Sequence, residues 1–232
     1  MRRVVGVLGG MGPEATLLLQ RRVMATVKAQ DDADHLPLLI DMNPQVPSRI
    51  AHLIEGTGES PAPVLAEMAR RLEAAGATAL AMPCNTAHHY KGAIAGAVGI
   101  PFLDMVALSV SEAALGLQKG AAVGLLASPA VRRAEVFGPA LVEAGLTALW
   151  PEDEAAMLEA IRAIKAAPGP WPEAEATLAR AARELAGRGA RALLVACSEF
   201  SLLSDTLSAP VPVIDTVDVL ARAIHAHTTG EG

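Results

Sequence analysis

The sequence is poor in aromatic residues and in blocks of positive charge. Phe, Trp and Tyr together make up 3% of its 232 residues, and the net charge is −6. Nucleic-acid binding usually requires a basic surface with stacking aromatic side chains, so we expect no nucleic-acid partner. No apolar run reaches the roughly 18 residues of a membrane-spanning helix, so we also expect no membrane association.

Cysteine is equally scarce, since only Cys84 and Cys197 occur. The apolar stretch near the start of the chain is short, is followed by glycines and lacks a small-residue cleavage site, which favours a buried strand over an export signal. We therefore expect free thiols and a cytoplasmic protein. Hydrophobic residues account for 52% and charged residues for 19%, which is typical of a folded chain with a sizeable core.

Apolar runs of strand length alternate with amphipathic stretches of helix length, which predicts an α/β fold with parallel sheets. Each cysteine directly follows such an apolar run. In open parallel sheets, ligands bind beyond the carboxyl ends of the strands, which is where both cysteines would lie. We expect strands at residues 3–9, 36–42, 79–82, 100–105, 122–127, 192–196 and 211–215.

The chain contains an internal repeat. Residues 72–84, which run from a helix end through a strand to a cysteine, recur as residues 185–197, and residues 100–104 recur as 211–215. We predict two pseudo-symmetric lobes, each a mostly parallel sheet flanked by helices, with the active site in the cleft between them. Residues 1–108 and 212–232 would form the N-terminal lobe with Cys84, and residues 109–211 the C-terminal lobe with Cys197.

Two thiols that face each other across a ligand can invert a carbon stereocentre. A thiolate removes a proton from one face of the carbon, and the opposed thiol delivers a proton to the other face. Charge that builds on an adjacent carboxylate needs fixed hydrogen-bond donors and cations. The alternative is that both cysteines are small core residues. Groups well placed to assist the reaction are Gly10, Met11, Gly12, Arg49, Asn85, Thr86, Ser128 and Ser198.

Other interpretations of the same residues remain open. A zinc site is conceivable at Cys84, His88 and His89. Four suitably spaced ligands are not apparent, however, so we expect no metal. His88 would instead support the pocket. Glu199 either orients the Cys197 thiol or a neighbouring amide, or is an ordinary acidic residue at a helix start. The run of glycines at 9–12 matches neither a dinucleotide fingerprint nor a phosphate loop, which leaves an anion site or a tight turn.

Four motifs together resemble the aspartate/glutamate racemase family, specifically its aspartate racemase branch. They are GGMGPEAT at 9–16, NPQVPSR at 43–49, PCNTAH at 83–88 and CSE at 197–199. The resemblance implies a cofactor-independent amino-acid racemase with a two-cysteine mechanism, commonly a homodimer. It also implies that Arg49 and Lys165 contact the carboxylates of a small dicarboxylic amino acid, with Asn85, Thr86 and Ser128 near its α-carboxylate and amino group.

Two departures from the family pattern bear on specificity. The family usually has Gly-Cys-Thr-Glu at the second cysteine, where this chain has Ala196 before Cys197 and Ser198 after it. The loop at Ser128 is often richer in threonine. Aspartate or glutamate racemisation is the expected reaction. The alternatives are a related reaction, such as that of maleate isomerase, hydantoin racemase or malonate decarboxylase, or a non-catalytic protein that binds small acids.

Overall fold

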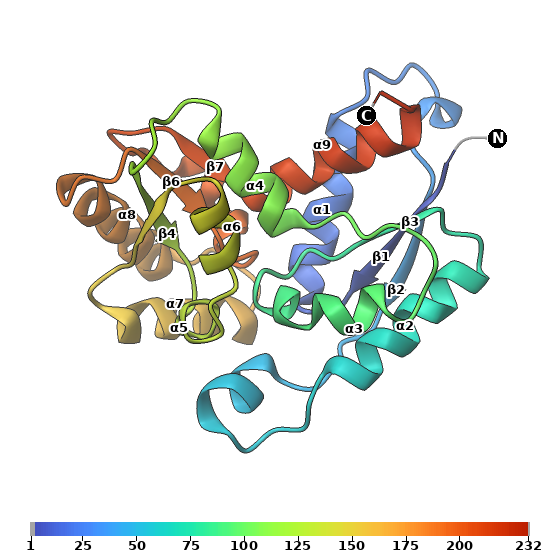
Figure 1. The fold of residues 1–232 in the computed structure, drawn as a ribbon, viewed down its shortest axis with the longest axis horizontal. Helices are drawn as coiled ribbons and strands as arrows, with labels where there is room; N and C mark the ends of the chain where they lie inside the picture. The colour runs from blue at the N-terminus through green and yellow to red at the C-terminus, as the bar shows by residue number, and fades with distance from the viewer. Residues whose placement is uncertain (1–2, 232) are drawn as a thin grey trace.

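The computed structural model describes residues 3–231 and consists of two lobes that lie side by side (Figure 1). Each lobe contains a parallel sheet flanked by helices. This confirms the predicted α/β fold with two parallel sheets. None of the helices within the described range is both long and apolar enough to cross a membrane.

The sheet of the first lobe has the strand order β2-β1-β3. Its central strand is buried along its whole length, because helices cover both faces of the sheet. The strands are β1 (Val5–Gly9), β2 (Leu38–Met42) and β3 (Ala79–Ala81). The helical segments of this part of the chain are α1 (Pro13–Ala25), η1 (Asp32–Asp34), η2 (Ala51–Glu55), α2 (Ala62–Ala74), η3 (Thr86–Tyr90) and α3 (Lys91–Ala95).

The sheet of the second lobe has the order β5-β4-β6-β7, and all its pairs are parallel. Its strands are β4 (Ala122–Leu126), β5 (Thr147–Leu149), β6 (Ala192–Val195) and β7 (Val213–Asp215). Its helical segments are α5 (Pro129–Arg133), α6 (Gly138–Glu143), α7 (Glu154–Ala166), α8 (Pro172–Gly187) and η4 (Phe200–Thr206).

Two long helices, α4 (Met105–Ala114) and α9 (Thr216–Thr229), pack on each other where the lobes meet, and α9 also packs on α1 (Figure 1). Both helices begin in the same way, directly after a segment of the repeat. Asp104 accepts a hydrogen bond from the backbone N–H of Val106 at 3.0 Å, and Asp215 accepts one from Val217 at 2.8 Å. The two repeated segments therefore each end on an aspartate that caps a helix at the lobe junction.

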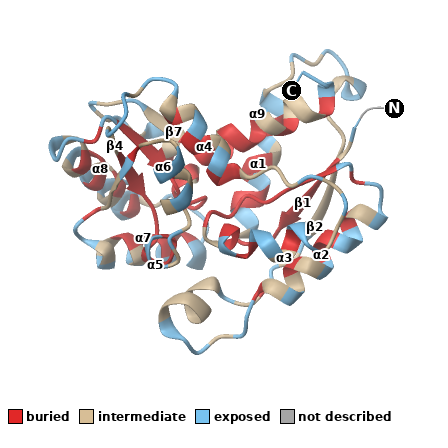
Figure 2. Ribbon diagram, viewed as in Figure 1, coloured by how far each residue is buried: buried red, intermediate tan, exposed pale blue. Residues whose placement is uncertain are grey.

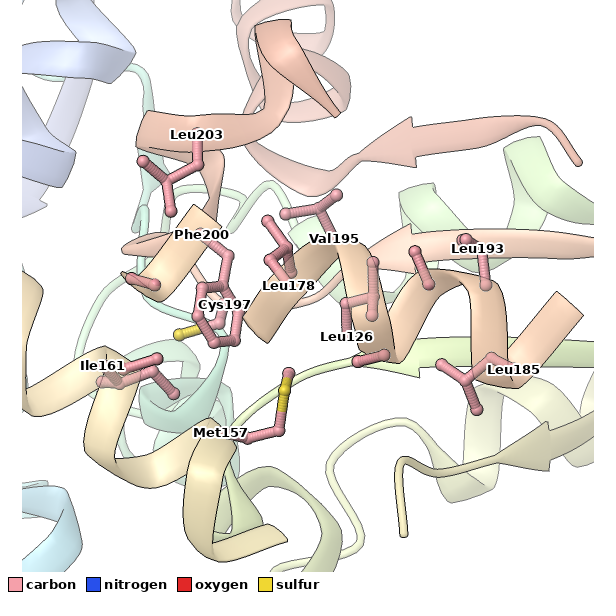
Figure 3. Packing of buried hydrophobic residues seen from close by; sticks show 14 of the residues in the cluster. Leu126, Met157, Ile161, Leu178, Leu185, Leu193, Val195, Cys197, Phe200 and Leu203 are labelled. Atoms are coloured by element: carbon pink, nitrogen blue, oxygen red, sulfur yellow. The ribbon is translucent and has the colours of Figure 1, made fainter. Parts of the chain in front are cut away.

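The two cysteines belong to different hydrophobic clusters. Cys84 packs with Leu8 and Met11 in the first lobe. Cys197 packs with Ile161 and Phe200 in the second lobe (Figure 3). Buried residues make up most of β1, β3, β4 and β6 and the packed sides of the helices at the junction, whereas β2 is only partly buried (Figure 2). Each lobe thus has its own core, and each core carries one thiol at its edge.

The structure corrects several expected elements. Residues 100–105 do not form a strand, because only Phe102 bridges to Leu80 before Asp104 starts α4. Strand β5 and the π-helical segment η2 were not expected. Strand β7 pairs with β6, so residues 213–215 lie in the second sheet although we assigned 212–232 to the N-terminal lobe. The rest of that division stays a prediction, and residues 1, 2 and 232 lie outside the described range.

Gly10 provides a test of the loop between β1 and α1. Its φ is +90°, and an added Cβ would lie 2.4 Å from the backbone carbonyl carbon of Asn43. We expect Gly10→Ala to lower the free energy of unfolding by about 3 kcal/mol or more, because strain and overlap add. Gly76 has a similar φ of +98° with nothing within 4 Å of an added Cβ. Gly76→Ala should therefore cost only about 1–2 kcal/mol. Urea unfolding measures both, and equal losses would contradict this account.

Candidate active site

A cavity of about 240 Å³ lies between the lobes. It is bordered by the loop after β2, the residues after β3, the start of α5, one side of α7 and the residues after β6. The residues that line it include two cysteines, an ion pair and several polar side chains, and among them are Met11, Arg49, Cys84, Thr86, Ser128, Lys165, Cys197 and Glu199.

Both thiols reach this one cavity from opposite lobes. Cys84 lies three residues beyond the end of β3, and Cys197 lies two residues beyond the end of β6. Both are free cysteines, with relative exposures of 7% and 5%. The strand ends thus place a sulfur from each lobe beside the same small volume.

Glu199 joins the Cys197 thiol to an ammonium group. The Sγ of Cys197 donates a hydrogen bond to Oε2 of Glu199 at 3.1 Å, and Nζ of Lys165 donates to Oε1 of the same carboxylate. Burial, reinforced by the Glu199 carboxylate, raises the pKa of Cys197 well above its ordinary value. Cys197 is therefore held as a protonated thiol at neutral pH.

Lys165 keeps its positive charge in this setting. Burial alone would lower the pKa of Lys165, but the Glu199 carboxylate, with smaller contributions from Cys84 and Cys197, raises it above its ordinary value. Lys165 lies on the last turn of α7, and its side chain is one-third exposed. A cation is thus fixed beside both sulfurs.

Arg49 is held by its own loop. Its NH1 donates to the backbone carbonyls of Val46 at 3.1 Å and Pro47 at 2.8 Å. A guanidinium carries five N–H donors, so the donors on its other nitrogens remain for a ligand. Across the cavity, the hydroxyls of Thr86 and Ser128 lie 3.4 Å apart, one from each lobe. Together these groups offer one cation and two hydroxyls to a carboxylate.

Four of the predicted site residues do not line this cavity. Asn85 and Ser198 are buried: Ser198 donates to the carbonyl oxygen of Pro83 in the first lobe, and Asn85 donates to the hydroxyl of Thr216 at the start of α9. The partner of Asn85 is Thr216, which sequence reasoning missed because no motif marks it. Gly10 and Gly12 line a second cavity instead.

The second cavity, of about 400 Å³, adjoins the first. The two share four lining residues, which are Pro44, Arg49, Lys165 and Glu199. Its other lining is mostly small or apolar, from the start of α1 and the end of α7. A Cβ on Gly12 would lie 3.6 Å from Oε1 of Glu199 and 3.8 Å from Nζ of Lys165. The ion pair therefore forms the boundary between the two cavities.

His88 supports the Cys84 loop from within the core. Its Nδ1 lies 2.8 Å from the carbonyl oxygen of Cys84, and the backbone N–H of Met105 donates to Nε2 at 3.3 Å. Nε2 is therefore an acceptor, and Nδ1 carries the hydrogen that binds the carbonyl. Burial lowers the pKa of His88, so the ring is neutral. Residues 3–231 contain no group of three or more His, Cys, Asp or Glu side chains arranged to hold a metal.

A cavity at the junction of two α/β lobes, bordered by a few convergent polar groups, is where an enzyme binds a small substrate. A family model described as Asp/Glu/Hydantoin racemase matches residues 8–224. The chain belongs to this family and is an isomerase, an amino-acid racemase. The resemblance seen in the motifs is thereby confirmed.

Relatives of this chain have been characterised or solved in several organisms. It is 25% identical to the broad specificity amino-acid racemase RacX of Bacillus subtilis (strain 168), over 95% of this chain and 96% of the relative. The structure of Picrophilus torridus aspartate racemase superposes with a TM-score of 0.84 at 26% identity, over 98% of this chain and 94% of that one. Glutamate racemase from Francisella tularensis shares the fold, with a TM-score of 0.64 at 16% identity over 99% and 82%.

The carboxylate of Glu199 provides a test of the Cys197 environment. In a Cys84→Ala background, Glu199→Gln should move the pH profile of Cys197 alkylation by iodoacetamide about 1 unit or more toward lower pH. The physical reason is that a charge that raises the pKa of the thiol is removed while Lys165 remains. Glu173→Gln removes the same charge from the exposed first turn of α8 and serves as the control. An unmoved profile for Glu199→Gln would refute the assigned cause.

Proposed function

We propose that this chain is a cofactor-independent aspartate (or glutamate) racemase in which Cys84 and Cys197 are the acid/base pair. The observation that carries the proposal is that one free thiol from each lobe, at matching positions of the repeat, lines the same cavity. Arg49 and the Thr86 and Ser128 hydroxyls border that cavity as well.

In one direction, the Cys84 thiolate removes the α-proton of the substrate, so the C–H bond breaks and an S–H bond forms. The Cys197 thiol, kept protonated by burial and Glu199, delivers its proton to the opposite face of the carbon. Negative charge passes transiently to the α-carboxylate, where Arg49 and the hydroxyls stabilise it. The reverse direction exchanges the two roles, and proton exchange with water restores the starting state.

A dicarboxylic substrate fits the cations of the site. Arg49 is the partner of one substrate carboxylate, and Lys165 is the partner of the other. Because Lys165 is already paired with Glu199, the distal carboxylate and Glu199 would both bind its ammonium group. Asn85, which the family resemblance would place near the substrate amino group, does not line the cavity, so it is not assigned a substrate contact. The aspartate racemase from Picrophilus torridus, 26% identical, supports aspartate as the first substrate to test. Assembly as a homodimer stays a prediction.

Broader specificity is the second candidate function. The second cavity continues past Lys165 and Glu199, and its small and apolar lining leaves room for side chains longer than that of aspartate. The Bacillus subtilis relative is described as a broad specificity amino-acid racemase. Under this candidate, the same two thiols act on several amino acids.

Removal of either thiol tests the two-cysteine mechanism. We expect Cys84→Ala and Cys197→Ala each to lower racemisation of L-aspartate by about 1,000-fold or more, because each direction needs both an acid and a base. Chiral chromatography after incubation in deuterated water measures inversion and deuterium uptake, and thermal unfolding checks that the variants fold. Racemisation retained in full by either variant would end the proposal.

A bulky residue in the second cavity tests the breadth of specificity. Ala167→Phe should lower kcat/KM for methionine relative to aspartate by about 10-fold or more, because the longer side chain loses its space. Ala163→Phe places the same bulk on another face of α7, toward α8, and is the control. Equal loss for both amino acids would show that the second cavity does not hold the side chain.

Wild-type activity on maleate, hydantoins or malonate, with none on amino acids, would favour the related reactions.

A further inference from the structure

The two cysteine loops are bonded directly to each other across the lobe junction. The hydroxyl of Ser198, the residue after Cys197, donates a hydrogen bond to the carbonyl oxygen of Pro83 at 2.7 Å. Pro83 is the residue before Cys84. This bond therefore joins the immediate neighbour of one sulfur-bearing residue to the immediate neighbour of the other.

In a second link the donor comes from the loop of Cys84 instead of the loop of Cys197. The Nδ2 of Asn85, the residue after Cys84, donates to the Oγ1 of Thr216 at 3.0 Å. The same hydroxyl donates to the carbonyl oxygen of Val195 at 2.9 Å, at the end of β6 and two residues before Cys197. A hydroxyl has one hydrogen to give and can accept others, so both bonds are satisfied at once.

Both links are dry. The relative exposures of Asn85, Ser198 and Thr216 are 2%, 2% and 0%. A buried hydrogen bond is expensive to break without a replacement, because water does not reach the freed partner. We call Pro83, Asn85, Val195, Ser198 and Thr216 the interlobe clamp. Helices α1, α4 and α9 also join the lobes, but the clamp is the junction that adjoins the two cysteines themselves.

We propose that Ser198 and Thr216 are positioning residues that set the placement of the Cys84 sulfur relative to the Cys197 sulfur. This rests on the proposed two-cysteine racemisation. Removal of an α-proton requires one correctly placed sulfur, whereas inversion requires two. A small shift of one lobe against the other therefore affects inversion more than proton removal.

The consequence is measurable as a change in the course of the reaction. When the second sulfur is displaced, the carbanion formed by one cysteine is protonated again by that same cysteine. In deuterated water the thiol exchanges its hydrogen, so deuterium enters the substrate without inversion. The C–H bond that breaks is replaced by a C–D bond on the same face, and the mechanism needs no other reactant.

The test is a single-enantiomer reaction in deuterated water, started from L-aspartate and read by chiral chromatography with mass spectrometry. Thr216→Val keeps the branched shape and removes the hydroxyl, and Ser198→Ala removes the other hydroxyl. Each should raise the ratio of deuterium in recovered L-aspartate to D-aspartate formed, by up to about 100-fold for a displacement near 1 Å. Thr216→Ser and Ser198→Thr keep a hydroxyl and should restore the ratio toward the wild-type value.

Ser109→Ala is the matched control. Ser109 is a fully buried serine on α4 whose hydroxyl donates to the carbonyl oxygen of Met105 at 2.7 Å, as Ser198 does to Pro83. It should lose a similar amount of stability and leave the ratio unchanged. If exchange and inversion fall in proportion in the clamp variants, or if Ser109→Ala changes the ratio as much, the positioning role is refuted.

Failure of the underlying function gives a different result. If the wild-type protein neither exchanges nor inverts the α-hydrogen of aspartate, glutamate or methionine, the racemase proposal itself fails. If the wild type inverts aspartate and the clamp variants keep the wild-type ratio, only the clamp inference fails. A clamp variant that does not fold is replaced by the other one, because the two hydroxyls belong to separate links.

Discussion

The site depends on one constraint, which is that the two thiols come from different lobes and must border a single small volume. Neither sulfur can compensate for movement of the other, because each is fixed at the end of a strand in a separate core. The helices at the junction hold the lobes together broadly, and the buried hydrogen bonds around Thr216 and Ser198 hold the cysteine loops locally. Under the proposed two-cysteine mechanism, the reaction geometry is thus a property of the junction between the lobes.

Much of this architecture could be predicted from the sequence because it repeats itself. The strand-then-cysteine pattern placed both thiols beyond parallel strands, and the fold class and family are confirmed. The repeated aspartates, Asp104 and Asp215, were visible as a pattern, but their common task of capping a helix was not. Strand β5 escaped notice because three residues at a sheet edge carry no readable alternation.

The direction of a side chain was harder to predict than its place in the chain. Asn85 and Ser198 adjoin the cysteines in sequence, which suggested contact with substrate, yet Asn85 bonds to Thr216 at the start of α9 and Ser198 bonds to Pro83 across the junction. Thr216 directly follows the repeated segment 211–215, but its bond with Asn85 became visible only when the lobes were assembled. Lys165 was expected to contact a substrate carboxylate, and it binds Glu199 in this structure. Pairing between lobes is a tertiary property that local patterns do not encode.

The two halves of the site are not chemically equivalent, although the lobes are related by the repeat. Two residues beyond Cys197 stands the carboxylate of Glu199, whereas two residues beyond Cys84 stands the hydroxyl of Thr86. Burial and the carboxylate hold Cys197 protonated, so under the proposed two-cysteine mechanism the resting enzyme is prepared for one enantiomer before the other. The two enantiomers have the same free energy in water, so no enzyme can change the equilibrium between them. The asymmetry therefore changes kcat and KM of each direction together, and the ratio of kcat/KM between the two directions, the Haldane ratio, stays fixed. Unequal thiols are therefore compatible with full racemisation by the proposed mechanism, in which they would determine which enantiomer meets an enzyme that is already in the right protonation state.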